Sequence, residues 1–199
     1  MFYRPEDGHG LKRNPWAALV TPRPIGWISS RGGTGDNLAP YSFFNIVAYS
    51  PPQIVFSSTG VKDSLTNIRE TGVFCANVVE EAMMEAANAT SAEFGPGVDE
   101  FARCGVPKAE CETIPCPRVA GAPASIEARV VQIVDLRGEG NHLVIGEATG
   151  IHLRDDCIVD GRFDVTRFRP VARMGYLDFA VVREVRALPR PKPGDQDGA

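Results

Sequence analysis

Hydroxyl-bearing and charged side chains are concentrated in one short stretch, Ser57-Ser58-Thr59-Gly60-Val61-Lys62-Asp63-Ser64. The apolar residues before it predict the end of a strand, and Asp63 or Ser64 is suited to cap a short helix. A helix N-terminus carries unpaired N–H donors and partial positive charge, so it stabilises a phosphate group. Lys62 would add a positive charge, and Ser57, Ser58 and Ser64 would add donors. From these residues alone, a phosphate site and an ordinary capped helix beside a solvated lysine are equally good interpretations.

A second candidate for binding a phosphate is Arg23, which stands between two prolines in the stretch Thr21-Pro22-Arg23-Pro24-Ile25-Gly26-Trp27. The prolines hold the backbone extended, so the arginine points in a fixed direction. Its fork of N–H donors suits a phosphate. The alternative is a surface arginine flanked by structural prolines, and Trp27 is expected to lie in the core.

The stretch Asn37-Leu38-Ala39-Pro40-Tyr41-Ser42-Phe43-Phe44-Asn45 could support a flat ring. The small side chains of Ala39 and Ser42 would let a ring lie against the backbone. Backbone N–H and C=O groups there could pair with the ring edge. A flavin needs such contacts, because partners at its ring nitrogens and oxygens tune its redox behaviour.

Two later residues are weaker candidates. His142 follows a glycine-rich turn and could reach the mouth of a pocket, although an exposed turn residue is the preferred interpretation. Tyr176, in Arg173-Met174-Gly175-Tyr176, could lie beside a ligand or belong to a plain strand and turn. The three histidines have no metal-ligand spacing, and no Ser/His/Asp set is legible. The glycine patterns of P-loops and Rossmann domains are also absent, so a dedicated dinucleotide fold is not expected.

The bulk composition describes an ordinary globular chain. It has 199 residues, 43% hydrophobic and 23% charged, with a formal net charge of -4. Without a dense basic stripe, nucleic acid is not an expected partner. No apolar run approaches the ~20 residues that span a bilayer. The first residues lack the apolar core of a signal peptide, which predicts a cytoplasmic protein.

Five cysteines are present, an odd number that argues against a fully paired disulfide framework. Cys75 lies in an apolar strand and is expected in the core. Cys104, Cys111 and Cys116 are close in sequence, but their spacings differ from those of structural zinc sites. Free thiols are the preferred interpretation, no metal is expected, and a loop disulfide formed under oxidation stays open.

The elements that must position these residues are mostly short strands. We expect strands at 17–20, 25–30, 41–48, 53–58, 73–79 and 142–152, a hairpin turn at 31–36, another turn at 138–141, and a strand near 126–133 whose apolar phase slips, as at a β-bulge. This spacing is typical of a β-barrel or sandwich. Helices are expected from Asp63 or Ser64 to about Thr71, and over the stretch holding Val79, Met83 and Ala86.

The predicted organisation is one domain, 1–188, with a Cys/Gly/Pro-rich excursion from the barrel at about 94–123 and one short helix near 99–103. Residues 189–199 are expected to be disordered, because they are almost free of apolar side chains.

The strings Thr21–Ser30, Asn37–Asn45, Pro51-Pro52 and Lys62–Ile68 occur in order and at close spacing. This combination resembles the flavin reductase-like, FMN-binding split-barrel family, which includes flavoredoxins and the reductase components of two-component monooxygenases. His142–Glu147 and Arg173–Tyr176 fit its second half, so the resemblance covers roughly Trp16 to Tyr176.

The resemblance implies a mainly β Greek-key split barrel, a homodimer and FMN bound near the subunit interface. Carried over by position, the residues that bind the cofactor would be Arg23, Ala39, Pro40, Tyr41, Ser42, Ser57, Ser58, Lys62, Asp63, Ser64, His142 and Tyr176. It also implies a flavoprotein oxidoreductase that passes hydride from NAD(P)H to flavin and electrons onward, with no catalytic acid or nucleophile. The alternatives are an electron carrier reduced by a partner protein, and a ligand-binding barrel without flavin.

Overall fold

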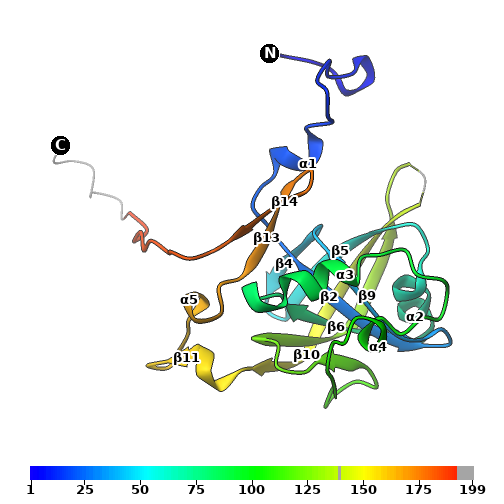
Figure 1. Ribbon diagram of the computed structural model, residues 1–199, viewed down its shortest axis with the longest axis vertical. Helices are drawn as coiled ribbons and strands as arrows, with labels where there is room; N and C mark the ends of the chain where they lie inside the picture. The colour runs from blue at the N-terminus through cyan, green and yellow to red at the C-terminus, as the bar shows by residue number, and fades with distance from the viewer. Residues whose placement is uncertain (139, 192–199) are drawn as a thin grey trace.

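The computed structural model describes residues 1–138 and 140–191. Its main element is a seven-stranded antiparallel sheet in the order β3-β2-β6-β9-β10-β5-β4. The strands are β2 (Gly26–Gly32), β3 (Gly35–Tyr41), β4 (Phe44–Tyr49), β5 (Pro52–Thr59), β6 (Val73–Val78), β9 (Ala124–Asp135) and β10 (Asn141–Leu153). The sheet curls into a barrel-like body, and the two ends of the chain extend away from this body as separate arms (Figure 1).

The two edge strands of this sheet are consecutive in the chain, and this closes the barrel. β3 ends at Tyr41, two residues follow, and β4 begins at Phe44. The Ser57 N–H donates to the Phe43 carbonyl over 2.9 Å, which extends the β4–β5 ladder to this corner. Across the closure, the Tyr41 ring of β3 and the Phe56 ring of β5 have centroids 4.8 Å apart. The expected strand 41–48 was therefore wrong as one element, because the chain turns a corner at residues 42 and 43. The split β-barrel itself is confirmed.

The phase slip in the apolar pattern marks a real bulge. β10 pairs Ile145 with Gln132 but Gly146 with Val130, so Val131 has no partner in the register. The bulge bends β9 and β10, the two longest strands, around the core. Gly146 is needed at this bend, because an added Cβ would lie 2.6 Å from the Phe74 ring.

Two apolar clusters fill the body. Inside the barrel, Phe56 and Phe74 meet edge to face, with ring centroids 5.3 Å apart. On the other side of β2, Trp27 is fully buried with Val79 and Phe101, as expected for a core tryptophan, and its indole N–H donates to Thr90 Oγ1 over 2.9 Å. Trp27 and Ile28, which are adjacent on β2, thus face different clusters, because successive side chains of a strand point to opposite faces.

The helix α2 (Asp63–Thr71) lies at one end of the barrel, and Gly72 ends it in a left-handed conformation with φ 69°, as expected. The expected cap was wrong: Lys62 occupies the N-cap position, because Asp63 and Ser64 make contacts elsewhere. The second predicted helix begins later than expected. β6 and Val79 precede it, a 3-10 turn (Glu81–Met83) follows, and α3 covers Met84–Ala89.

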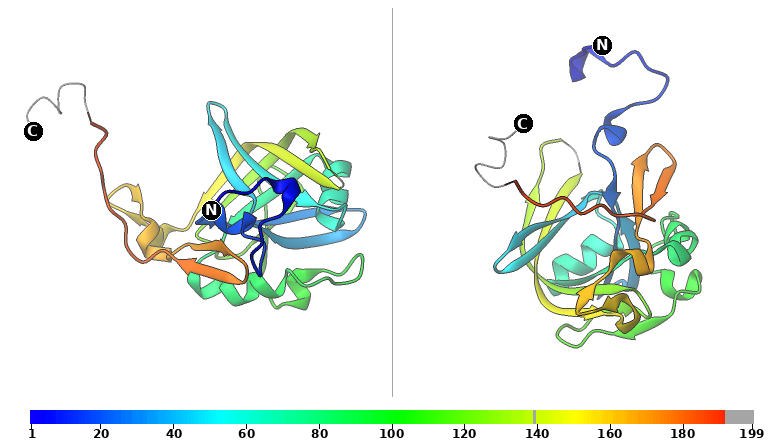
Figure 2. Two further views of the ribbon diagram at one scale, coloured as in Figure 1. Left: turned by 90° about the horizontal axis from the view of Figure 1, so that it is seen from above. Right: turned by 90° about the vertical axis from the view of Figure 1, so that its left-hand side faces the viewer.

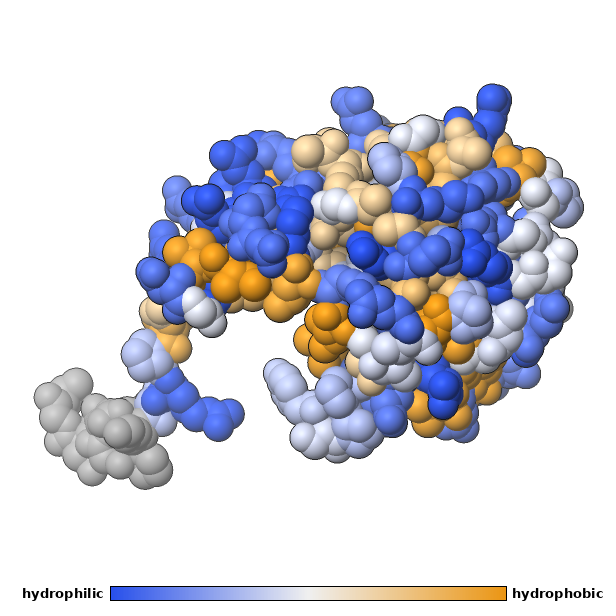
Figure 3. Space-filling model, turned by 90° about the horizontal axis from the view of Figure 1, so that it is seen from below, coloured by the Kyte–Doolittle hydropathy of each residue, from blue (hydrophilic) through white to orange (hydrophobic). Residues whose placement is uncertain are grey.

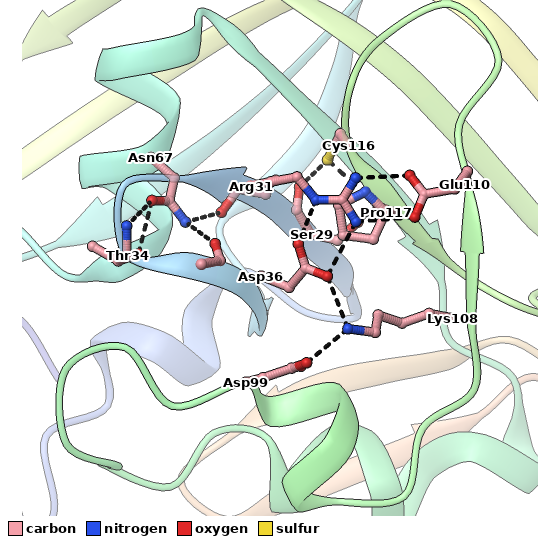
Figure 4. A network of polar contacts seen from close by, with 12 residues as sticks. Ser29, Arg31, Thr34, Asp36, Asn67, Asp99, Lys108, Glu110, Cys116 and Pro117 are labelled. Carbon is pink, nitrogen blue, oxygen red and sulfur yellow. Dashed lines mark hydrogen bonds and ion pairs between the residues drawn. The ribbon is translucent and has the colours of Figure 1, made fainter.

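The excursion after residue 94 folds back on the barrel. It holds α4 (Glu100–Arg103), capped by Asp99, and the hairpin of β7 (Lys108–Glu110) and β8 (Pro117–Val119). Figure 4 shows Arg31 between Asp36 and Glu110, and Lys108 between Asp36 and Asp99. These ion pairs tie the hairpin and α4 to the β2–β3 turn. The short helix predicted near 99–103 is confirmed.

The chain ends form smaller elements outside the barrel. They are a 3-10 turn (Pro5–Asp7), α1 (Trp16–Leu19), the three-stranded sheet β1 (Arg23–Pro24), β13 (Val171–Gly175) and β14 (Asp178–Val181), a 3-10 turn (Asp155–Cys157), the pair β11 (Ile158–Val159) and β12 (Arg162–Phe163), and α5 (Val165–Phe168). Figure 2 shows that the N-terminal segment and the C-terminal arm leave the barrel separately.

The predicted strand at 17–20 was wrong, because α1 occupies most of it and Arg23 binds the carbonyls of Ala17 and Val20. Residues 189–191 are exposed and irregular, and the rest of the predicted disordered tail lies outside the described residues. None of the helices in the described part of the chain combines the length and hydropathy that a membrane span requires.

Candidate functional site

A cavity of about 460 Å³ opens where β3, β5 and the start of α2 meet the segment that leads from α3 to α4. Its lining is Asn37, Ala39, Pro40, Tyr41, Ser57, Ser58, Thr59, Val61, Lys62, Asp63, Ser64, Thr90, Ser91, Ala92, Glu93, Phe94, Pro96 and Glu100. The volume lies in the range of ordinary cofactor pockets. One end is rich in hydroxyls and the other is formed by Ala39 and Pro40.

The polar end of the cavity is suited to an anion. In the described structure no side chain caps the N-terminus of the nine-residue helix α2, which points its partial positive charge toward the cavity. Lys62 stands at that terminus, largely exposed, and pairs with Glu93 over 3.5 Å. An exposed ion pair of this kind contributes little stability, so a bound phosphate could replace the Glu93 carboxylate at low cost.

A buried polar chain fixes this end of the cavity. Ser64 Oγ donates to Asn37 Oδ1, and Asn37 Nδ2 donates to both carboxylate oxygens of Glu100 over 3.1 and 3.0 Å. The Leu38 N–H donates to Glu100 Oε2 over 3.0 Å. Burial raises the pKa of Glu100 in spite of this last bond. These hydrogen bonds join α2, β3 and α4, so the cavity walls are held at fixed separation.

Tyr41 links the polar end to the ring-sized end. Its hydroxyl hydrogen-bonds with Ser64 and Ser58, and burial raises its pKa. The adjoining wall is the β3 segment Ala39–Pro40, whose small and rigid side chains leave the backbone accessible to a flat ligand. The phenol of Tyr41 is therefore a neutral donor at the floor of the cavity.

A second cavity of about 240 Å³ adjoins the first and shares Pro40 and Ser91 with it. Its lining is mostly apolar and includes Val79, Met84 and Phe179. Arg173 brings a guanidinium, which stacks 4.4 Å from the centroid of the Phe179 ring.

The structure brings eight of the twelve predicted cofactor residues to the first cavity: Ala39, Pro40, Tyr41, Ser57, Ser58, Lys62, Asp63 and Ser64. Ser42 lines the second cavity instead. These residues are placed around one space, and their binding of a cofactor stays a prediction.

Three predicted residues lie outside both cavities. Arg23 Nη1 donates to the carbonyls of Ala17 and Val20, so this nitrogen holds α1, while the buried Nε has no partner in the described residues. His142 pairs with Ser58 in the β10–β5 register, but its Nδ1 lies 2.6 Å from Asp135 Oδ1 and it lines neither cavity. Tyr176 is partly exposed with φ 48°, in the tight β13–β14 turn.

The sequence interpretation missed the wall formed by Thr90 to Phe94, Pro96 and Glu100. This segment carries no phosphate-binding signal of its own. The one available hint was Glu100, a carboxylate in the stretch predicted to be an excursion from the barrel. Its partners, Asn37 and Leu38, are 63 and 62 residues away in the chain.

The cysteines are grouped differently from the sequence order. Cys75, Cys111 and Cys116 pack together, whereas Cys104 contacts the tryptophan-side core. All five are free thiols, and Cys75 is fully buried as expected. Among the residues that the structure describes, no group of three or more His, Cys, Asp or Glu side chains could hold a metal ion.

Comparison with known proteins gives a consistent result. Residues 19–167 match the model of the flavin reductase like domain. An uncharacterized protein of Deinococcus radiodurans is 36% identical over 171 residues, which cover 79% of this chain and 74% of that protein.

Two solved structures are also similar. Nitrilotriacetate monooxygenase component B from Bacillus cereus superposes with a TM-score of 0.87 and 28% identity, over 94% of this chain and 98% of that chain. The 2-nitrobenzoate 2-nitroreductase NbaA of Pseudomonas fluorescens gives a TM-score of 0.81 and 29% identity, over 88% of each chain.

Proposed function

Because the chain belongs to the flavin reductase-like domain family, we propose that this flavin-related oxidoreductase uses FMN to pass electrons from NAD(P)H to an acceptor. The observation that carries the proposal is the cavity of about 460 Å³, which combines an uncapped helix N-terminus and Lys62 at one end with a flat backbone wall at the other. A flavin mononucleotide needs the charged end for its phosphate and the flat wall for its ring.

The residues present fit the phosphate of FMN. Ser57 would donate a hydrogen bond to a phosphate oxygen, and Lys62 would supply the positive charge. Ser58 and Ser64 would donate once their hydroxyls turn from the Gly60 carbonyl and from Asn37 Oδ1, which accept their protons in this structure. The N–H groups at the start of α2 would add further donors. Asp63 does not compete for this role, because its Oδ2 accepts from the Gly97 N–H over 2.8 Å.

At the other end, the residues of β3 fit an isoalloxazine ring. Ala39 and Pro40 would lie against the ring face, while backbone groups of this edge strand would meet its polar edge. The flavin, when bound, supplies the chemistry of hydride acceptance and electron transfer. The chain would orient the ring, exclude water from one face through the wall at 90–96, and keep Tyr41 protonated beneath it.

The second cavity would receive the reductant or the acceptor. It adjoins the first at Pro40 and Ser91, is mostly apolar, and carries the Arg173 guanidinium. An aromatic ring with an acidic substituent matches that lining, because the apolar wall packs on a ring and the guanidinium pairs with an anion. The name of the similar 2-nitrobenzoate 2-nitroreductase contains a compound of this kind, so small aromatic acids are candidate acceptors.

A homodimer is part of the same proposal. Large apolar side chains are exposed on the edge strand β4, including Ile46, Val47 and Tyr49, the last 88% exposed. Figure 3 shows hydrophobic surface both on the body and on the arm that leads to the C-terminal residues. Exposed apolar surface of this extent is typical of an interface.

The experiment is an anaerobic titration of the purified chain with FMN and with riboflavin, followed by NADH and by NADPH. We expect FMN to bind more tightly than riboflavin, because only FMN reaches the Lys62 end. Bleaching of the bound flavin by either nucleotide supports the reductase. FMN binding without bleaching would favour a carrier reduced by another protein, and failure to bind FMN would reject the proposal.

A further inference from the structure

Cys111 and Cys116 face one another across the β7–β8 hairpin. The hairpin pairs Glu110 with Pro117, and the next pair in this register is Cys111 with Cys116. The Cys111 N–H donates to the Cys116 carbonyl over 3.0 Å, which continues the ladder by one step. The Cα atoms of a hydrogen-bonded antiparallel pair lie about 5.5 Å apart, within the range that a disulfide spans. Neither residue lines the two cavities described above.

The side chains of Cys111, Cys116 and Cys75 pack together in one cluster. Hydrogen bonds from the Cys116 and Cys75 thiols lower the pKa of Cys111 to about 5. The same bond to Cys111, together with burial, raises the pKa of Cys116. Cys116 is fully buried, whereas Cys111 is partly exposed. The arrangement is thus one accessible thiolate backed by buried thiol donors.

A buried carboxylate holds the four residues between the two cysteines. Glu127 Oε1 accepts from the Glu112 N–H over 2.7 Å, and Oε2 accepts from the Thr113 N–H over 2.6 Å. His152 Nε2 lies 2.5 Å from Glu127 Oε1 on the other side. The turn between the cysteines is therefore fixed to β9, so the sulfurs keep their positions.

The other side of the hairpin is fixed to β2. Figure 4 shows Cys116 beside Ser29 and Pro117, and Cys116 Sγ lies 3.3 Å from the Ser29 carbonyl oxygen. Arg31 binds both oxygens of Glu110, the residue before Cys111. Two sets of contacts, to β9 and to β2, thus set the geometry of the pair.

We propose that Cys111 and Cys116 form a dithiol site that reduces hydroperoxides and closes to a disulfide. The Cys111 thiolate attacks the terminal oxygen of the hydroperoxide, an S–O bond forms and the O–O bond breaks. The leaving alkoxide or hydroxide takes a proton from solvent. Cys116 then attacks the Cys111 sulfur, the S–S bond forms, the S–O bond breaks, and hydroxide leaves with the thiol proton of Cys116 as water. The two thiols lose two electrons, and the peroxide gains them.

Cys116 rather than Cys75 is the partner in the disulfide. Cys75 lies within β6, where both neighbouring strands hold its backbone, and its Sγ lies 3.8 Å from Asn77 Oδ1. Cys116 lies opposite Cys111 in a two-stranded hairpin. Oxidation of Cys111 removes the thiolate that raises the pKa of Cys116 and of Cys75 alike, so backbone position decides between the two.

The test is to treat the purified chain with hydrogen peroxide, alkylate remaining thiols, digest it with trypsin without reduction, and map the peptides. Residues 109–118 form one tryptic peptide that holds both Cys111 and Cys116, while Cys75 lies in 70–103 and Cys104 in 104–108. We expect peptide 109–118 to carry no alkyl group and to be lighter than the reduced peptide by about 2 Da, the mass of the two thiol hydrogens. One equivalent of peroxide should be consumed for each disulfide.

Matched variants separate the roles. Cys111→Ser should lower the rate of peroxide consumption at least tenfold, and Cys104→Ser should leave that rate unchanged. Cys116→Ser should leave a sulfenic acid on Cys111 that a dimedone-type reagent traps. A cross-link between 70–103 and 109–118 would overturn the pairing with Cys116. Reaction confined to Cys104, or sulfinic acid on Cys111 in the wild-type chain without any disulfide, would overturn the dithiol site.

Discussion

Ser64 Oγ, in the first turn of α2, donates a hydrogen bond to Oδ1 of Asn37, which lies 27 residues earlier on β3. Both side chains are buried, and both line the cavity. Through this one bond, the helix terminus proposed to bind phosphate is positioned against the strand proposed to support the flavin ring.

Replacement of Ser64 by alanine should therefore change two properties. Loss of a buried hydrogen bond should lower the free energy of unfolding by ~1–2 kcal/mol, because Asn37 Oδ1 is left without this donor. The affinity for FMN should fall as well, because this bond holds the N-terminus of α2 against β3. Urea unfolding and fluorescence titration measure these effects. Thr66→Ala, an exposed site on the same helix, is the control, and an equal loss of stability there would contradict the role of the bond.

Replacement of Lys62 by alanine should weaken FMN binding about 10- to 100-fold, the loss of one charge-assisted contact to phosphate. Riboflavin, which lacks the phosphate, should bind both proteins equally. The difference between the two ligands isolates the phosphate end. Arg69→Ala, at the other end of α2, is the matched control. Equal FMN affinity in the parent and in Lys62→Ala would reject the proposed phosphate site.

Glu100 should make the stability of the protein depend on pH. Burial raises its pKa, so the folded state binds this proton more strongly than the unfolded state. The stabilising contribution is present below the unfolded pKa and is lost as pH rises through the folded pKa. The midpoint temperature of unfolding of Glu100→Gln, relative to that of the wild type, should therefore rise as the pH is increased from 4 to 7. Exposed Glu85→Gln is the control, and a pH-independent difference for Glu100→Gln would contradict this assignment.

Glu127 should act in the opposite direction. Burial alone would raise its pKa, but hydrogen bonds from Thr113, His152 and two backbone N–H groups lower it to about 2. Its contribution is therefore present above the unfolded pKa and is lost as pH falls through about 2. Glu127→Gln should lose ~3 kcal/mol at neutral pH and much less at pH 3, as measured by urea unfolding. The Glu127→Gln substitution should also slow disulfide formation, because it loosens the turn between Cys111 and Cys116. An unchanged rate would show that Glu127 does not position these two cysteines.

The thiol of Cys111 should react with iodoacetamide almost equally fast at pH 8 and pH 6, because its pKa is lowered to about 5. Cys104, whose pKa is raised by burial, should slow by about a hundredfold over the same range. Peptide mapping after short labelling times gives both rates from one sample. A hundredfold fall for Cys111 as well would show that its thiolate is not stabilised.

The sequence alone determined the parts that local signals encode. The helix after Lys62, its end at Gly72, the hairpin at 31–36 and the bulge at Val131 all depend on neighbouring residues, and all occur in the structure. The order of motifs, through the family that it resembles, also assigned residues 39–41 and 57–64 to one candidate site, and the structure places them around one cavity.

Tertiary structure decided what depends on contacts between distant residues. The carbonyls of Ala17 and Val20 engage the guanidinium of Arg23, and Asp135 engages the imidazole of His142, which residue type cannot indicate. Glu100 reaches the cavity across 63 residues, and Cys75 joins Cys111 only because β6 passes beneath the excursion. Which side chains share a buried space is set by packing of the whole sheet, and no local pattern in the sequence carries that information.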